Sequence, residues 1–323
     1  MKYLNITLPK GDMEISKIIL GTDYFGTTVS EETAFRLLDI FVEAGGNCVD
    51  TARVYAAWLR GGKGASEKLI GRWLKTRKNR EKMIISTKGG HPPLEKMKSS
   101  RLSRKEIESD LDESLGALGV DTIDLYWLHR DSVKIPVEDI METLAVMVAK
   151  GKVRAVGCSN WRTDRIEKAN QMAKQNGLVP FCASQIQWSL AASTPEAHED
   201  STIVCMDEQE YKWYLNEGMP VMAYSSQAKG FFACAATKGL KAINKKAFDR
   251  FCTPENIARL ERVKEYSAKN GLTPSAVALG YILCNNTPAT AIVGCKTEEQ
   301  LLDTLTAANV DLPKQVVEWL RGQ

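Results

Sequence analysis

The chain lacks several features that would assign it to a specialised class of protein. Its 323 residues contain no run of eighteen apolar residues, so we expect no segment that crosses a membrane as a helix. The first residues lack the apolar core of a secretory signal, so we expect no secretory signal. Lys and Arg number 43 against 40 Asp and Glu, which is too balanced for an electrostatic attraction to nucleic acid. We therefore expect neither a membrane nor a nucleic acid as a partner.

Histidine is scarce, and the cysteines are not arranged in pairs. Only three histidines occur, far apart in the sequence, which argues against a His-based zinc site, so we expect no metal. The eight cysteines include no C-x-x-C pair, which is typical of reduced thiols in a cytoplasmic protein. Hydrophobic residues make up 44% and charged residues 26%, as in ordinary globular proteins. The sequence contains no heptad repeat from which an oligomeric state could be inferred, so that state is left open.

What the sequence does contain is an alternation of short apolar segments with amphipathic ones. No linker rich in Pro or Ser divides them, so we expect a single domain over residues 1–323. Short apolar segments bounded by Gly, Pro or polar residues predict strands. The predicted strands are residues 18–21, 47–50, 83–87, 124–129, 153–159, 181–187, 220–224 and 290–293.

Helix signals stand between these strands. Ser30 is a good N-cap, and Ser103 with Glu106 forms a capping box. Two Thr-Pro pairs, each an N-cap before a proline at the first helical position, predict two extra helices after positions 253 and 273. The predicted helices cover residues 31–44, 104–118, 137–150 and 162–176, a helix opening at Thr297, the two extra helices, and 313–321.

Eight strands alternating with helices predict a (β/α)8 TIM barrel. A doubly wound sheet is the rival, but it needs a G-x-G-x-x-G motif after its first strand, and none is present. Residues 3–8 and 13–15 predict an N-terminal β-hairpin that closes the bottom of the barrel. Two connections, 188–207 and 225–252, are unusually long, and long loops at one face of a barrel are more often functional than idle.

Four polar side chains follow three neighbouring predicted strands, at the barrel face where chemistry is expected: Asp50, Tyr55, Lys88 and His129. A lysine ammonium beside a tyrosine is expected to lower the pKa of the phenol, and a carboxylate keeps that lysine charged. An imidazole can orient a carbonyl oxygen. Together the four groups suit the protonation of a carbonyl oxygen while a hydride reaches the carbon.

Several motifs in this order resemble the aldo-keto reductases over nearly the full length of the chain. They are D-T-A-x-x-Y at 50–55, S-T-K-G-G at 86–90, D-L-Y-W-L-H at 124–129, G-K-V-R-A-V-G-C-S-N at 151–160, A-S-Q-I at 183–186, A-Y-S-S at 223–226 and V-G-C-K-T-E-E-Q at 293–300. The resemblance implies a barrel enzyme that interconverts a carbonyl compound and its alcohol with a nicotinamide cofactor. It implies Tyr55 as the general acid and base, tuned by Lys88 and Asp50, with His129 placing the substrate carbonyl.

The same resemblance implies cofactor and substrate contacts. For the cofactor they are Gly21, Thr22, Asp23, Tyr24, Ser159, Asn160, Gln185, Tyr224, Ser225, Ser226, Gln227, Gly294, Cys295, Lys296, Thr297 and Gln300. For the substrate pocket they are Tyr24, Trp58, His91 and His129. Residues 294–297 precede a predicted helix N-terminus, which favours an anion, and Lys296 adds a cation. A 2′-phosphate there favours NADPH, with NADH as the alternative. The basic stretch Lys238–Arg250 either folds over the cofactor phosphates or forms a solvated face.

The chain departs from the common family pattern at three places. Ser226-Gln227 stands where many members have Pro-Leu, Thr304 where many have Asn, and residues 56–65 are inserted after Tyr55. Trp58 and Arg60 in this insertion suggest a pocket for an oxygen-rich or anionic substrate.

Two other functions remain open from the sequence. Lys88 at a strand end is also suited to forming a Schiff base, as the lysines of aldolases do. Some barrels of this kind are nicotinamide sensors or accessory subunits that turn over slowly. Each of the four residues also has an ordinary structural explanation, for example His129 as a core histidine or Asp50 as an N-cap, but the four together favour a site.

Overall fold

The computed structural model describes residues 1–9 and 11–322, and its centre is a closed barrel of eight parallel strands. Each strand pairs with its neighbours in the order β10-β3-β4-β5-β6-β7-β8-β9, so the predicted (β/α)8 TIM barrel is confirmed. The barrel strands are β3 Ile18–Gly21, β4 Cys48–Asp50, β5 Ile84–Gly89, β6 Ile123–Leu128, β7 Val153–Ser159, β8 Ser184–Gln187, β9 Val221–Tyr224 and β10 Ala289–Gly294.

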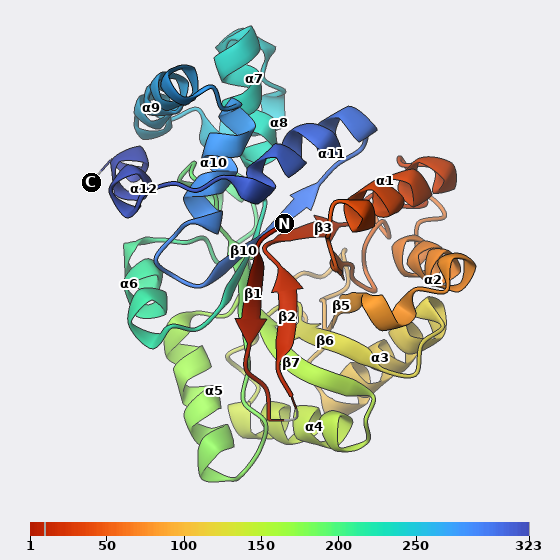
Figure 1. Ribbon diagram of the computed structural model, residues 1–323. Helices are drawn as coiled ribbons and strands as arrows, with labels where there is room; N and C mark the ends of the chain where they lie inside the picture. Colours follow the sequence, from red (N-terminus) through yellow and green to blue (C-terminus); the bar gives the residue numbers. More distant parts are fainter. Residues whose placement is uncertain (10, 323) are drawn as a thin grey trace.

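Helices surround the barrel in a ring (Figure 1). The first five are α1 Glu31–Glu43, α2 Ala65–Arg77, α3 Arg104–Leu118, α4 Val137–Ala149 and α5 Thr163–Gln175. The others are α6 Glu208–Glu217, α7 Phe231–Lys238, α8 Lys245–Phe251, α9 Pro254–Asn270, α10 Pro274–Leu283, α11 Glu298–Leu305 and α12 Lys314–Arg321. No helix among the described residues has both the length and the apolar character needed to cross a bilayer.

An antiparallel hairpin lies across one opening of the barrel, as predicted. Strand β1 Tyr3–Ile6 pairs with β2 Met13–Ser16, and both are drawn in red across the centre of Figure 1. Lys10, in the predicted turn, lies outside the described residues. The buried side chains of Ile6, Met13 and Ile15 pack on the residues that fill the inside of the barrel, such as Trp127. This seals the end at which the strands begin.

The hydrophobic core has two layers, because each strand of a barrel presents alternate side chains inward and outward. The inner layer is small, and Trp127 is its largest buried side chain. The outer layer lies between the strands and the helices and holds most of the buried aliphatic side chains, such as Leu20, Val49 and Ile85 on strands and Leu144 on α4. This two-layer packing fixes the strand ends at which the candidate site is built.

Four helices were not predicted from the sequence. Helix α2 begins after Gly64, which adopts φ 67° and offers no side-chain cap, so the usual start signal is missing. Helices α7 and α8 occupy much of the predicted connection 225–252, and α7 also begins after a glycine, Gly230. Helix α6 starts directly after the other long connection, with Asp207 as its N-cap. Strand β8 starts three residues later than predicted, at Ser184.

Candidate active site

The carboxyl ends of β4, β5 and β6 bring the predicted catalytic residues together. In the sheet register Asp50 on β4 lies opposite Ser86 on β5, and Lys88 on β5 lies opposite Trp127 on β6. Ser86 and Lys88 are two residues apart, so both side chains point to the same side of the sheet, into the barrel. Asp50 and Lys88 are almost completely buried. The register of β4 and β5 therefore places the buried cation of Lys88 beside the buried anion of Asp50.

Lys88 is the centre of this arrangement. Its Nζ donates to Oδ2 of Asp50 at 2.5 Å, to the carbonyl oxygen of Thr51 at 2.7 Å and to Oη of Tyr55 at 2.8 Å. The three acceptors use all three N–H bonds of an ammonium group. Burial lowers the pKa of Lys88, and the charge of Asp50 opposes that effect. The lysine is therefore a fixed donor aimed at the tyrosine hydroxyl.

The other carboxylate oxygen of Asp50 is also held. Oδ1 accepts a hydrogen bond from Ser86 Oγ at 2.8 Å and one from Gln185 Nε2 at 3.1 Å. The indole Nε1 of Trp127 donates to Ser86 Oγ at 2.7 Å and fixes that hydroxyl. Tyr55 Oη makes a longer hydrogen bond, 3.4 Å, to Oδ2. Because both of its oxygens accept hydrogen bonds, the Asp50 carboxylate is positioned rigidly beside Lys88.

Tyr55 has a raised pKa, which differs from the expectation. Burial raises its pKa well above the ordinary value of 10, and the charges of Asp50 and Asp23 add to this. The sequence predicts that Lys88 lowers this pKa, but Asp50 lies against the same ammonium and offsets its charge. Without a ligand, Tyr55 is therefore a protonated hydroxyl, the form that a proton donor needs.

His129 lies next to Tyr55, with ring centroids 6.0 Å apart. Burial lowers its pKa well below 6.5, and His91 and Arg130 lower it further, so the ring is neutral. His91 packs edge-on against His129 with centroids 4.7 Å apart. The structure thus places all four predicted catalytic residues, and His91 from the predicted substrate pocket, in one cluster.

The residues predicted to hold the nicotinamide carboxamide stand at the ends of β7 and β8. Asn160 adopts φ 60°, a left-handed conformation that asparagine tolerates. Its Nδ2 donates to the carbonyl oxygen of His129 and to Ser159 Oγ, and its Oδ1 accepts from Tyr224 Oη at 2.7 Å. Ser159, Asn160 and Gln185 are all buried. The predicted group is therefore assembled, and its amides already form hydrogen bonds within the protein.

Several other predicted cofactor residues have hydroxyl or amide groups bound within the fold. Thr22 Oγ1 donates to the carbonyl oxygen of Asp50, and Ser226 Oγ donates to that of Ile292. Gln227 Nε2 donates to Thr304 Oγ1 at 2.9 Å. Ser225 adopts φ 52° at the end of β9. Gly21 pairs with Gly294 across β3 and β10, so these glycines border the same opening.

The predicted phosphate segment leads into α11. Thr297 is the N-cap, and its side chain accepts a hydrogen bond from the backbone N–H of Gln300. The Gln300 side chain in turn accepts from the backbone N–H of Lys296 at 2.8 Å. Cys295 is buried, with its sulfur 3.7 Å from Thr304 Oγ1. The Lys296 ammonium lies over the ring of Tyr24, 4.2 Å from its centre.

Positive charge gathers around Asp23 and Tyr24. Burial raises the pKa of Asp23, while the charges of Lys229 and Lys296 oppose this. Burial lowers the pKa of Lys229, and Arg250 and Lys246 lower it further. Of the basic stretch, Arg250 and Lys246 thus act on this cluster. The four lysines of the stretch, Lys238, Lys241, Lys245 and Lys246, are exposed, and Arg250 is partly buried. None of Lys229, Lys296 and Arg250 forms an ion pair with a residue that the structure describes.

Trp58 stands at the rim, half-exposed. Its ring lies edge-on to Tyr24 at 6.2 Å and to Tyr55 at 6.4 Å between centroids. The insertion after Tyr55 therefore places an aromatic side chain between a predicted cofactor residue and the predicted acid. Among the described residues, no group of three or more His, Cys, Asp or Glu side chains is arranged to hold a metal ion.

Three residues that belong to this environment are not predicted as site residues from the sequence: Ser86, Arg130 and Lys229. Ser86 could have been found, because it lies two residues before Lys88 on a predicted strand and so shares its face. Arg130 follows His129 directly, and its guanidinium is held by Asp200 and Thr202 of the connection after β8. Lys229 adopts φ 52° in an irregular segment, and no local signal predicts its position.

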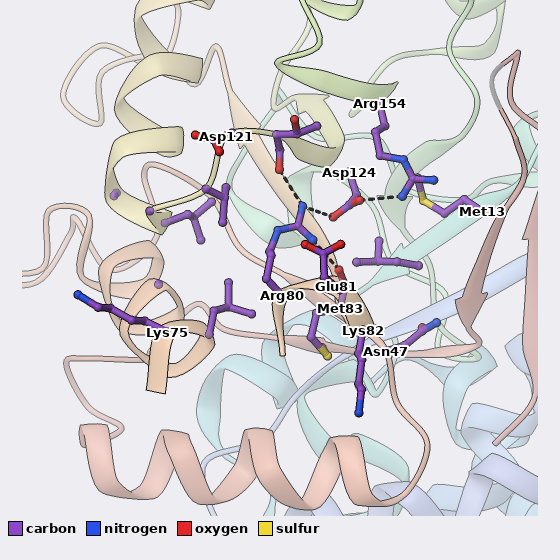
Figure 2. Close-up of a pocket in the computed structure, with 18 of the residues that line it drawn as sticks. Met13, Asn47, Lys75, Arg80, Glu81, Lys82, Met83, Asp121, Asp124 and Arg154 are labelled. Atoms are coloured by element: carbon purple, nitrogen blue, oxygen red, sulfur yellow. Dashed lines mark hydrogen bonds and ion pairs between the residues drawn. The ribbon is translucent and has the colours of Figure 1, made fainter. Parts of the chain in front are cut away.

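A cleft of about 1270 Å³ lies at the opposite end of the barrel. It is lined by the starts of β5, β6 and β7 and by the hairpin, and Figure 2 shows its charged groups. There the buried carboxylate of Asp124 lies between Arg80 and Arg154, each at 2.8 Å (Figure 2). Because these charged groups pair with one another, we interpret the cleft as part of the end of the barrel that contributes to stability rather than to catalysis.

Comparison with known proteins agrees with this geometry. The Aldo/keto reductase family model matches residues 17–322. The chain belongs to the aldo/keto reductase family. It is 30% identical to a norsolorinic acid reductase of Emericella nidulans, over 98% of this chain and 80% of that protein. It is 29% identical to the oxidoreductase YrpG of Bacillus subtilis (97% and 93%) and 26% identical to an NADP-dependent aryl-alcohol dehydrogenase of Phanerodontia chrysosporium (97% and 83%).

Membership in the aldo/keto reductase family makes the chain an oxidoreductase of small-molecule carbonyl compounds that uses a nicotinamide cofactor. The resemblance stated from the motifs is thereby confirmed.

Proposed function

We propose that this aldo/keto reductase reversibly reduces an aldehyde or ketone with NADPH, and that Tyr55 is its general acid and base. The observation that carries the proposal is the 2.8 Å hydrogen bond from Lys88 Nζ to Tyr55 Oη, beside the buried Asp50. A hydroxyl whose oxygen accepts a hydrogen bond from an ammonium group can release its own proton, because the negative charge that forms on oxygen is stabilised in place.

Each residue of the cluster then has a role in the reaction. The cofactor supplies the hydride when it is bound. Tyr55 and the neutral ring of His129 bind the carbonyl oxygen, and Tyr55 Oη gives that oxygen its proton. Lys88 stabilises the tyrosinate that remains, and Asp50 keeps the Lys88 ammonium oriented. In alcohol oxidation the same tyrosine takes the proton back.

The residues around the opening fit a dinucleotide. Lys229, Lys296 and Arg250 are brought together without ion-pair partners among the described residues, an arrangement that is unfavourable until anions are bound. Phosphates of the cofactor would supply those anions, with Lys296 at the N-terminus of α11 holding a 2′-phosphate. Tyr224, tied to Asn160, would stack on the nicotinamide ring. This arrangement supports NADPH rather than NADH.

A Schiff base at Lys88 is disfavoured by the same geometry. A nucleophilic amine needs a free lone pair, but Lys88 donates three hydrogen bonds and lies against a carboxylate that keeps it protonated.

The proposal includes a cytoplasmic location, which is expected from the unpaired cysteines. The structure describes all eight cysteines as free thiols.

The test combines binding with turnover. Tryptophan fluorescence is titrated with NADPH and with NADH, and NADPH oxidation is then followed with a panel of carbonyl compounds that begins with aryl aldehydes, given the half-exposed Trp58 and the aryl-alcohol dehydrogenase among the relatives. Tyr55→Phe is expected to bind NADPH as the wild type does and to lose nearly all turnover. Undiminished turnover would remove Tyr55 from its role, and tight binding with slow turnover of every carbonyl would indicate a sensor.

A further inference from the structure

His91 stands beside the carbonyl-binding residue His129 and has no part in the reaction described above. It follows the end of β5, where the chain turns at Gly90 with φ 70°. Two prolines, Pro92 and Pro93, come next and restrict the backbone that carries the ring. The ring is buried and packs edge-on against His129, with centroids 4.7 Å apart and planes at 68°. Its position is therefore fixed from both sides.

The tautomer of His91 follows from its one hydrogen bond. Nδ1 lies 2.6 Å from the carbonyl oxygen of Pro92, and a carbonyl oxygen only accepts, so Nδ1 carries the proton. Burial, with the nearby charge of Arg130, lowers the pKa of His91 to about 4, so the ring is neutral at pH 7. Nε2 is then a lone-pair acceptor. It forms no hydrogen bond with any residue that the structure describes and, unlike Nδ1 of His129, is accessible to solvent.

The ring proton of His129 is on the other nitrogen from that of His91. Its Nδ1 is buried without a hydrogen-bond partner among the described residues. A buried N–H without a partner is rarer and costlier than a free acceptor, which places the proton of this neutral ring on Nε2. His129 thus offers a donor at Nε2, as a carbonyl oxygen requires, while its neighbour His91 offers an acceptor.

We infer that the substrate carries a hydroxyl group on the carbon next to its carbonyl, and that His91 recognises this hydroxyl. The inference rests on the proposed carbonyl reduction. A donor and an acceptor on two touching rings match two oxygens on adjacent carbons, one a carbonyl that accepts and the other a hydroxyl that donates. A simple ketone that covers His91 Nε2 displaces water from it without supplying a donor, which disfavours it. His91 is accordingly a specificity-determining residue.

The test compares two ketones that differ only in this hydroxyl, 3-hydroxy-2-butanone and 2-butanone. We expect the wild type to prefer the hydroxyketone by about tenfold or more in kcat/KM, as for a site that hydrogen-bonds a substrate hydroxyl. His91→Phe keeps a ring of similar shape and removes the acceptor. It is expected to abolish the preference between the two ketones, whatever its absolute activity, and NADPH binding equal to that of the wild type shows that the variant is folded. His91→Gln, whose amide oxygen accepts, is expected to restore part of the preference.

A binding experiment keeps the inference separate from the proposed activity. Tryptophan fluorescence of the NADP+ complex is titrated with 2,3-butanediol and with 2-butanol. The wild type is expected to bind the diol about tenfold more tightly, and His91→Phe to bind the two alcohols alike. Equal binding by the wild type, or a preference that survives in His91→Phe, would overturn the role of His91 even if turnover is normal. If Tyr55→Phe keeps its activity while the diol preference holds, the proposed mechanism fails and the recognition by His91 stands.

Discussion

Nε2 of Gln185 lies 3.1 Å from Oδ1 of Asp50, so a residue expected to hold the nicotinamide carboxamide is hydrogen-bonded to the carboxylate that orients Lys88. Asp50 Oδ2 binds Lys88, and Lys88 binds the hydroxyl of Tyr55. One continuous chain of hydrogen bonds therefore joins the end of β8 to the proposed proton donor. Buried hydrogen-bond networks of this kind polarise one another, so a change at one end is felt at the other.

The first prediction follows from this chain. Gln185→Leu removes a donor from Asp50 and from the proposed carboxamide site at once. A hydrogen bond to a charged group contributes about 1.5–3 kcal/mol, so we expect NADPH affinity and kcat both to fall by at least about tenfold. Fluorescence titration and steady-state kinetics measure the two effects. Gln171→Leu, on the exposed side of α5, is the matched control and should change neither. A fall in affinity alone would show that the link to Asp50 has no part in turnover.

A second prediction concerns the buried ion pair itself. Asp50→Ala leaves the Lys88 ammonium buried without its partner, which costs about 3–5 kcal/mol of stability when one side of a buried pair is removed. The comparison is with Asp311→Ala, which breaks the exposed pair with Lys2 and should cost less than about 1 kcal/mol. Urea unfolding at pH 7 measures both. Equal losses in the two variants would mean that Lys88 finds another partner or takes up water.

Most of the barrel could be predicted from sequence because its signals are local. Each strand is a short apolar segment between polar residues. A Ser or Thr N-cap marks where a helix begins, as at Ser103 for α3 and Thr297 for α11. Helices α2 and α7 begin after Gly64 and Gly230 in left-handed conformations, so the rules for side-chain caps do not detect them. Their positions depend on packing against the barrel.

In the candidate site, too, some features have local sequence signals and others depend on the packed structure. Asp50, Lys88 and His129 were found because strand ends converge in any such barrel, and the motifs of the family stand there. The direction of the Tyr55 pKa was predicted wrongly, because sequence does not show that burial and Asp50 outweigh Lys88. The position of Lys229 depends on a backbone with φ 52°, which no short-range pattern predicts.

A third prediction tests the choice of cofactor. Lys296→Ala removes a cation from the start of α11, so we expect weaker NADPH binding, by about five- to tenfold, with little change for NADH, which lacks the 2′-phosphate. Lys82→Ala, in the cleft at the opposite end of the barrel, is the control of equal charge change. Titrations at low and high salt separate this contact from general electrostatics. Parallel losses for both cofactors would place Lys296 on a phosphate that the two share.

The last prediction concerns pH and stability. The pKa of His91 is about 4 in the folded protein against 6.5 ordinarily. Above pH 6.5 the ring is neutral in both states and contributes nothing to the pH dependence. As the pH falls from 6.5 to 4, the unfolded chain takes up a proton that the folded protein does not, so stability is lost. The difference in pKa corresponds to a loss of about 3 kcal/mol by pH 4.

His91→Phe removes this titration and should flatten the decline. The unfolding free energies of the variant and the wild type are measured in urea at pH values from 7 to 4. We expect the difference, variant minus wild type, to be about 3 kcal/mol more positive at pH 4 than at pH 7. His198→Phe is the control, because burial also lowers the pKa of His198 to about 4, but this ring is less buried and better screened by solvent. Its effect should have the same sign and be smaller. If the curves of the wild type and His91→Phe stay parallel, His91 is protonated in the folded protein, and its Nε2 is then no acceptor for a substrate hydroxyl.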